Sequence, residues 1–211
     1  MKRILLIVTM LLLMFSVVGC TNQSASSDTA SSPNTSTDKT SDKKILVAYF
    51  SRADENYGVG YVEKGNTAHL AEIIAEETGG TLFEIKSTTP YPKSYKECGE
   101  FAKKERDENA RPTLTATVEN FDEYDVIYLG YPIWWHDLPM PVYTFLESYS
   151  FAGKTIIPFC THAGSGLDGT DNQIRSTVPN ATIGKPLVMY GTTAQNEPRT
   201  AQRQVVEWLN R

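Results

Sequence analysis

Short apolar runs without polar interruption alternate along this chain with longer stretches in which apolar residues recur every three or four positions. The run at residues 45–50 lacks the alternation of a half-exposed strand, which is typical of a strand buried on both faces of a sheet. Residues 82–85 and 126–129 are the second and third predicted strands. Residues 154–161 and 186–190 complete a set of five predicted strands.

Stretches with helical periodicity lie between these runs. Residues 66–78 place leucine and isoleucine on one side and glutamates on the other, and two glycines then end the helix. Further helices are predicted at residues 141–149 and at the C-terminal end, and residues 91–111 are predicted as a charged, solvent-exposed helix. This alternation indicates an α/β fold with a doubly wound parallel sheet. Pro158 fits less well, because a proline in a central strand removes a ladder hydrogen bond.

The N-terminal residues are excluded from the predicted domain. Two basic residues precede an apolar run that is too short to remain as a membrane span. Cys20 follows a small residue, which resembles the lipobox of bacterial lipoproteins, so residues 1–19 are predicted to be a signal peptide and Cys20 to carry lipid. A plain signal peptide with an incidental cysteine is the alternative. Residues 20–43, rich in serine and threonine, are predicted to be a disordered tether. The domain is therefore expected on the outer side of the bacterial cell membrane.

Residues 44–211 make one domain of ordinary size. The formal charge of the chain is −5, and it becomes −7 without the two basic residues of the signal peptide. An acidic domain argues against nucleic acid and against lying flat on anionic lipid, so the N-terminal lipid is the only membrane contact that we expect. Cys98 and Cys160 are too few for a disulfide framework, although one bridge between them is possible.

Candidate binding residues follow the predicted strands. In an open parallel sheet, ligands bind beyond the carboxyl ends of the strands. The first strand is followed by Ser51 and Arg52, and the next helix begins at Gly65, Asn66 and Thr67. Small polar groups at a helix N-terminus suit a phosphate, although Asn66 or Thr67 could equally be a plain N-cap. No glycine-rich dinucleotide motif or P-loop motif is present.

The loops after the third and fourth predicted strands indicate which other groups the ligand contains. Trp134 and Trp135 follow the third predicted strand, and because successive side chains point in opposite directions, at least one should offer a flat face at the rim. Residues 160–166 are small and glycine-rich, so their backbone can approach a planar edge and donate hydrogen bonds. A phosphate site, an aromatic face and a backbone-lined edge together indicate flavin mononucleotide (FMN).

The motifs YFS…GNT, GYPIWWHDLPMP and FCTHAGSG occur in this order, and with them residues 44–211 resemble a flavodoxin-like domain. The resemblance implies a five-stranded sheet of order 2-1-3-4-5 with helices on both faces, non-covalently bound FMN and a redox function. Carried over by position, it assigns the phosphate to Ser51, Arg52, Gly65, Asn66 and Thr67, the ring to Pro132, Ile133, Trp134 and Trp135, and the third loop to Thr161, His162, Gly164 and Ser165.

One departure from the family pattern is the insertion of residues 53–64 into the phosphate loop. Its aromatic residues Tyr57 and Tyr61 could fold over the cofactor or a substrate. The leading hypothesis is an FMN-binding electron-transfer protein that serves a redox partner protein or a small electron acceptor. The alternatives are an FMN-dependent NAD(P)H:acceptor oxidoreductase of the quinone type and a flavin-free module that binds a partner.

The remaining polar residues suggest no other chemistry. No nucleophile with its base can be assembled, and no spacing of histidines and carboxylates indicates a metal site. His162 is a candidate for tuning the flavin by charge or hydrogen bonding, and His69 is expected to be structural.

Overall fold

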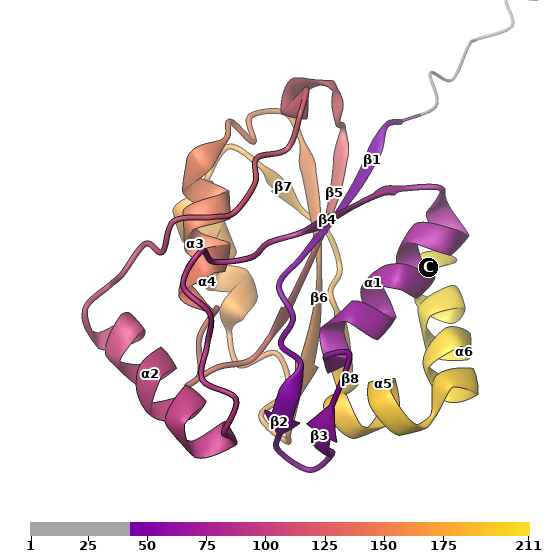
Figure 1. Ribbon diagram of the computed structural model, residues 1–211. Helices are drawn as coiled ribbons and strands as arrows, with labels where there is room; N and C mark the ends of the chain where they lie inside the picture. The colour runs from indigo at the N-terminus through magenta and orange to yellow at the C-terminus, as the bar shows by residue number, and fades with distance from the viewer. Residues whose placement is uncertain (1–42) are drawn as a thin grey trace, which may run out of the picture. The chain divides into compact units, whose positions relative to one another are not determined.

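The computed structural model of the protein describes residues 43–211. The predictions for the signal peptide, for the lipid on Cys20 and for the tether lie outside the described residues. Within residues 43–211, no helix is long and apolar enough to cross a membrane. The strands are β1 (Ile45–Tyr49), β2 (Asp54–Asn56), β3 (Gly60–Val62), β4 (Thr81–Glu84), β5 (Val126–Pro132), β6 (Thr155–His162), β7 (Thr182–Ile183) and β8 (Leu187–Tyr190). The helices are α1 (Asn66–Thr78), α2 (Tyr95–Asp107), α3 (Met140–Ser148), α4 (Thr170–Thr177), α5 (Gly191–Asn196) and α6 (Pro198–Leu209), with a 3-10 turn at Phe121–Glu123 (Figure 1).

The main sheet is parallel and has the order β4-β1-β5-β6-β7, with β8 also paired to β6 (Figure 1). This confirms the predicted order 2-1-3-4-5, because β7 and β8 together occupy the fifth position. The apolar runs lie in the centre of the sheet, where β1 and β5 are buried along most of their length. The predicted strands and the helix 66–78 therefore formed where the periodicity placed them.

Pro158 is accommodated in β6 because the strand paired with β6 on the side away from β5 changes there from β7 to β8. The N–H of Thr155 donates to Asp125 on the β5 side, whereas the carbonyl of Ile156 accepts from Gly184 on the opposite side. Because peptide groups alternate sides along a strand, the missing N–H of Pro158 faces away from β5. Pairing with β7 ends at Ile156 and pairing with β8 begins at Phe159, so the proline lies in the gap.

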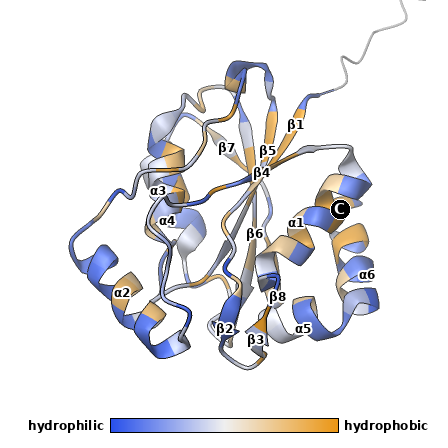
Figure 2. Ribbon diagram, viewed as in Figure 1, coloured by the Kyte–Doolittle hydropathy of each residue, from blue (hydrophilic) through white to orange (hydrophobic). Residues whose placement is uncertain are grey.

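Helices cover both faces of the sheet (Figure 1). One core packs α1 and α6 against the sheet through Leu70, Ile74 and Val205, and the other packs α3 and α4 through Phe145 and Ile174. Both cores are continuous with the apolar strands, which stand out from the hydrophilic outer faces of the helices (Figure 2). The three loops with candidate residues are thereby brought to one edge of the sheet.

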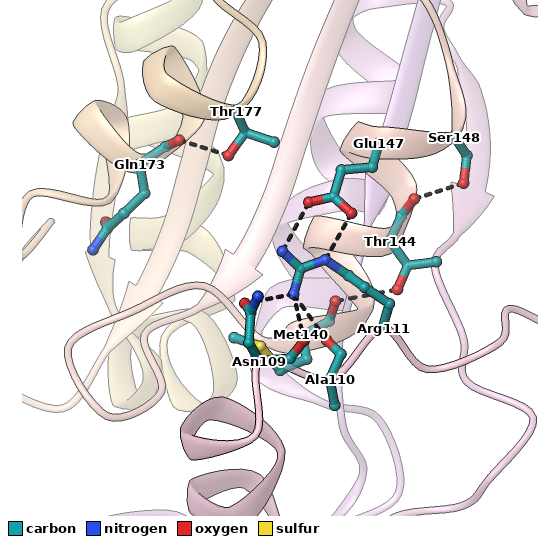
Figure 3. Close-up of polar contacts among 9 residues, drawn as sticks. All are labelled: Asn109, Ala110, Arg111, Met140, Thr144, Glu147, Ser148, Gln173 and Thr177. Carbon is teal, nitrogen blue, oxygen red and sulfur yellow. Dashed lines mark hydrogen bonds and ion pairs between the residues drawn. The ribbon is translucent and has the colours of Figure 1, made fainter.

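Helix α2 is largely hydrophilic and buries only Cys98 and Ala102 (Figure 2). The segment that follows α2 is bound to α3 through Arg111. The guanidinium of Arg111 donates to both carboxylate oxygens of Glu147, at 2.7 and 2.8 Å (Figure 3). Two parallel hydrogen bonds fix the orientation of such a pair as well as its distance. The connection between α2 and β5 is therefore held on α3, and α2 lies beside the carboxyl edge of the sheet.

Candidate functional site

A cavity of about 610 Å³ lies at the carboxyl ends of β1, β5, β6 and β8, within the size range of small-molecule sites. Nine of the thirteen residues predicted to bind a cofactor line it: Arg52, Asn66, Pro132, Ile133, Trp134, Trp135, Thr161, His162 and Ser165. The other four, Ser51, Gly65, Thr67 and Gly164, do not line the cavity, but each is next in sequence to a residue that does. Thr67 and Gly164 are also hydrogen-bonded to the lining residues Thr161 and His162. The structure thus brings the three predicted loops together.

The start of α1 provides a set of uncommitted donors. Its N-cap residue, Gly65, has no side chain, and the hydroxyl of Ser51 instead accepts the N–H of Ala68 at 3.1 Å. The N–H groups of Asn66 and Thr67, at the first two helical positions, have no acceptor within the helix. Ser51 thus replaces the missing cap and keeps its own hydroxyl proton for a ligand.

Two glycines hold this region in a close arrangement. A Cβ built on Gly65 would lie 2.3 Å from the carbonyl oxygen of Arg52, and one built on Gly191 would lie 2.5 Å from Nδ2 of Asn66. Neither position has a positive φ, so close approach, rather than backbone conformation, requires glycine here. The carboxamide of Asn66 is therefore confined, and its Oδ1 is buried without a hydrogen-bond partner among residues 43–211. Because the two ends of an amide exchange by a half turn, the same site can present an N–H to an anion.

Thr67 and Arg52 have structural contacts at this site. The hydroxyl of Thr67 lies 2.8 Å from that of Thr161, and both side chains are buried, so α1 and the end of β6 are joined. The guanidinium of Arg52 donates to the backbone carbonyls of Glu55, Pro92 and Lys93. Arg52 thus holds the inserted segment, at Glu55, against the residues that precede α2, Pro92 and Lys93.

The paired tryptophans lie in a strained turn. Trp134 and Asp137 exchange backbone hydrogen bonds of 3.1 and 3.0 Å, and the residues between them, Trp135 and His136, have φ values of 52° and 65°. Positive φ at both central positions belongs to the type I′ turn, which favours asparagine and glycine. Non-glycine residues in this region cost on the order of 1–3 kcal/mol each, and such strain concentrates at functional sites.

The two tryptophans have different surroundings, as the alternation predicted. Trp134 packs edge-to-face against Phe50 and Tyr91, at centroid distances of 5.2 and 5.1 Å. Trp135 is 45% exposed at the rim, where its indole N–H donates to the carbonyl of Gly99 at 2.8 Å. Arg106 donates to the Trp135 carbonyl at 3.0 Å and lies over its ring. The ring of Trp135 is thus exposed and yet fixed in orientation.

His162 organises the glycine-rich loop. Its Nδ1 accepts the N–H groups of Gly164 and Gly166, at 3.0 and 3.1 Å, so the proton of the neutral ring is on Nε2. Burial lowers the pKa of His162, which keeps the ring neutral. Two of the backbone donors that the loop was expected to offer to a ligand are therefore used internally. The ring itself packs against Tyr190, with 4.3 Å between centroids.

The inserted segment 53–64 forms an antiparallel hairpin, β2–β3, beside the cavity. At its base, the N–H of Glu55 donates to Lys93, and the carboxylate of Glu55 accepts the N–H of Tyr95 at the start of α2. At its tip, a Cβ built on Gly58 would lie 3.3 Å from the Thr192 side chain at the start of α5. The hairpin thus reaches from α2 to α5, and its residues 56–58 line the cavity.

Helix α2 forms a wall that the sequence did not predict. Its residues Tyr95, Cys98 and Gly99 line the cavity, as does Ala102 one turn later, although the segment was predicted to be simply solvated. The available signal was a glycine in the middle of a helical stretch. Residues 190–192, at the end of β8, also line the cavity and were not predicted. Both cysteines of the domain are free and buried, and burial raises the pKa of both, that of Cys160 to about 12.

Comparison with known proteins agrees with this geometry. A flavodoxin family model matches residues 44–210. The structure is similar to that of a protein assigned as a flavoprotein from Bacteroides eggerthii, with 30% identity over 79% of this chain and 96% of the other and a TM-score of 0.63. A counterpart from Bacteroides uniformis has 30% identity over 80% and 99%, also with a TM-score of 0.63.

A flavoprotein from Lactobacillus acidophilus in complex with FMN shares the fold at 19% identity, over 72% of this chain and 95% of the other, with a TM-score of 0.56. Among curated proteins, no sequence matches the chain significantly. The family model spans nearly all of the described domain, and the sheet order agrees with it. The chain therefore belongs to the flavodoxin family.

Proposed function

We propose that the domain binds FMN in the cavity at the carboxyl edge of the sheet and passes electrons to a redox partner protein or a small acceptor. The observation that carries this proposal is Oδ1 of Asn66, which is buried without a hydrogen-bond partner among residues 43–211 and lies in the first turn of α1, beside its free N–H groups. A buried polar atom without a partner is costly, whereas the amide turned by a half turn would place its NH2 group in the same position, where it could donate to a phosphate held at the helix N-terminus. FMN also accounts for the aromatic faces of the cavity, and it is the ligand of the Lactobacillus acidophilus protein.

Neutral donors would hold the phosphate. Lys64 is paired with Glu72 at 2.7 Å, and the guanidinium of Arg52 is committed to backbone carbonyls. The hydroxyl of Ser51 and the N–H groups of Asn66 and Thr67 would therefore donate to the phosphate. Trp134 and the His162 loop would enclose the ring, and Nε2–H of His162 is the donor that this loop can offer to it. Bound FMN supplies the electron-transfer chemistry, while the protein sets its access and potential.

The inserted hairpin favours a second candidate function. Its residues 56–58 form part of the cavity wall, whereas an electron carrier needs its flavin edge open to a partner. An FMN-dependent oxidoreductase that uses NAD(P)H and a small acceptor would benefit from such a wall. Steady NAD(P)H oxidation by the FMN-loaded protein would favour this candidate over the carrier.

The location of the domain is part of the proposal. The motif at Cys20 and the polar residues 21–43 support a lipid anchor and a tether on the outer side of the bacterial cell membrane. Cys20→Ala should then release the protein from the membrane without unfolding it. Equal partitioning of both forms into detergent would contradict the anchor.

Cofactor binding is tested by isolating the protein, releasing any bound flavin and titrating the apoprotein with FMN and with riboflavin. If the start of α1 holds a phosphate, FMN should bind much more tightly than riboflavin. Equal affinity for the two would refute the phosphate site, and absence of any flavin binding would favour the flavin-free partner module.

A further inference from the structure

We propose that the cavity holds a second ligand beside the cofactor, a planar, uncharged quinone of one or two rings, on the side formed by α2. This α2 side of the cavity is defined by Gly99 and Tyr95 of α2, Trp135 of the rim and Tyr57 of the hairpin. The inference rests on the proposed binding of FMN, because the quinone would lie next to the cofactor.

The cavity has two kinds of wall. One kind comes from the three loops that carry the flavodoxin motifs, at the ends of β1, β5 and β6. The other kind comes from α2, from the β2–β3 hairpin and from residues 190–192, which belong to none of those motifs. The three motifs therefore do not account for the second kind of wall, which the proposal assigns to a second ligand.

Gly99 shows that the α2 side is kept open. It lies inside α2, where glycine disfavours the helix. A Cβ built on it would meet no atom within 4 Å, and its φ is not positive, so neither packing nor backbone conformation requires glycine. Since Gly99 lines the cavity and the space around its Cβ position is open, a larger side chain here would take up part of that space. The absence of one lets a flat ligand approach the helix backbone.

Aromatic side chains surround this opening. Tyr57, Tyr95 and Trp135 are each 45% exposed or more, and all three line the cavity. Tyr57 lies 5.8 Å from Tyr95 between ring centroids, so the hairpin and α2 meet above the site. The hydrogen bond to Gly99 and the contact with Arg106 keep Trp135 in place. Fixed aromatic faces bind planar ligands with little loss of side-chain entropy.

The polar groups at this end suit an uncharged ligand with oxygen atoms at its edge. Lys96 and Glu100 line the cavity and lie 4.0 Å apart, so their charges offset each other. His136 is largely exposed at the rim, and its Nδ1 lies 2.6 Å from the carboxylate of Asp168. This contact holds the ring and leaves Nε2 available to a ligand oxygen. Among planar, uncharged molecules with carbonyl oxygens at the edge, a quinone is the class that can also accept electrons from the flavin of the proposed function.

The test is a calorimetric titration of the oxidised, FMN-loaded protein with 2,3-dimethyl-1,4-naphthoquinone, without any reductant. The substituted ring carbons of this probe cannot add to Cys98. Gly99→Leu fills the opening with a side chain that helices tolerate better than glycine. Gly99→Ala adds only one methyl group, and Lys104→Leu places the same leucine on an exposed position of α2 outside the cavity lining.

We expect the wild type and Lys104→Leu to bind the quinone alike, Gly99→Ala to bind it within about threefold, and Gly99→Leu to bind it at least tenfold more weakly. FMN affinity should stay within about threefold in all four proteins. The inference is wrong if the wild-type holoprotein binds no quinone or if Gly99→Leu binds it normally. It is also wrong if Gly99→Leu loses FMN affinity, because the space would then belong to the cofactor. A wild type that binds no FMN would instead refute the proposed function.

Discussion

Replacing Gly191 with alanine should displace the carboxamide of Asn66 and weaken FMN binding without unfolding the domain. The new Cβ would lie 2.5 Å from Nδ2 of Asn66, a distance that real Cβ contacts do not sustain, and 3.3 Å from its Cγ, which is a tight contact. The backbone at Gly191 has no positive φ, so alanine itself is tolerated there. The strain is therefore relieved by rotation of the Asn66 side chain, which moves the amide away from the proposed phosphate site.

The magnitude follows from the hydrogen bond that is lost. A hydrogen bond to a charged group contributes about 1.5–3 kcal/mol, so the Kd for FMN should rise roughly 10- to 150-fold. Gly99→Ala is the matched control, because it is also a cavity-lining glycine in a helix but its new methyl group meets no atom within 4 Å. FMN affinity should be unchanged in that control.

The assay is a fluorescence titration of apoprotein with FMN in a double-mutant cycle with Asn66→Ala. Both substitutions act on the same amide, so Gly191→Ala should add little to the loss already caused by Asn66→Ala. The reasoning fails if Gly191→Ala binds FMN as the wild type does. It also fails if the double variant loses the sum of the two single effects, because Gly191 would then act through another group.

Three further predictions concern stability. Gly99→Ala should raise the free energy of unfolding by about 0.8–1 kcal/mol, because alanine favours a helix interior, and thermal unfolding should show a Tm about 2–4 °C higher; an unchanged or lower Tm would contradict the open space at Gly99. The pKa of His162 is lowered in the folded protein, so its contribution to stability is complete above the unfolded value near 6.5 and is lost as the ring becomes protonated. The Tm should therefore fall as the pH drops from 7 to 5. The Tm of His162→Asn, whose side chain keeps an acceptor but does not titrate, should fall less over the same range. Glu147→Gln should cost up to about 1 kcal/mol at neutral pH, because the pair with Arg111 is partly exposed. Since Arg111 lowers the pKa of Glu147 from its ordinary value of 4.5, this cost should shrink as the pH falls below 4.5 and disappear below the lowered pKa; a cost independent of pH would show that charge is not involved.

The sequence by itself determined the framework of the protein. The apolar run at residues 45–50 has no alternation, which is typical of burial on both faces, and this pattern is local enough to be read from the sequence. The C-terminal end of helix α1 could also be predicted locally, because Gly79 and Gly80 end the helix through their own backbone preference. With the strands fixed, their following loops had to meet at one edge, which is why Asn66, Trp134 and His162 could be predicted as neighbours of one cavity.

Only the tertiary structure decided how that cavity is closed. The charged sequence of α2 predicted a solvated helix, because two buried residues, Cys98 and Ala102, give almost no periodic signal. Its function as a wall depends on contacts with residues 36 to 41 positions away, such as the bonds of Trp135 to Gly99 and of Arg52 to Lys93. The inserted segment likewise became a hairpin because α2 and Arg52 hold its base.

The same distinction applies to single residues. Pro158 conflicted with its strand in the sequence, and the conflict disappears because β7 and β8 share one position in the sheet. Gly191 had no predicted role, since only the approach of α5 to α1 places it against Asn66. The turn at Trp135 and His136 adopts positive φ although neither residue favours it. Local preference decides where strands and helices form, whereas contacts between distant segments decide which residues must be small, strained or unpaired at the site.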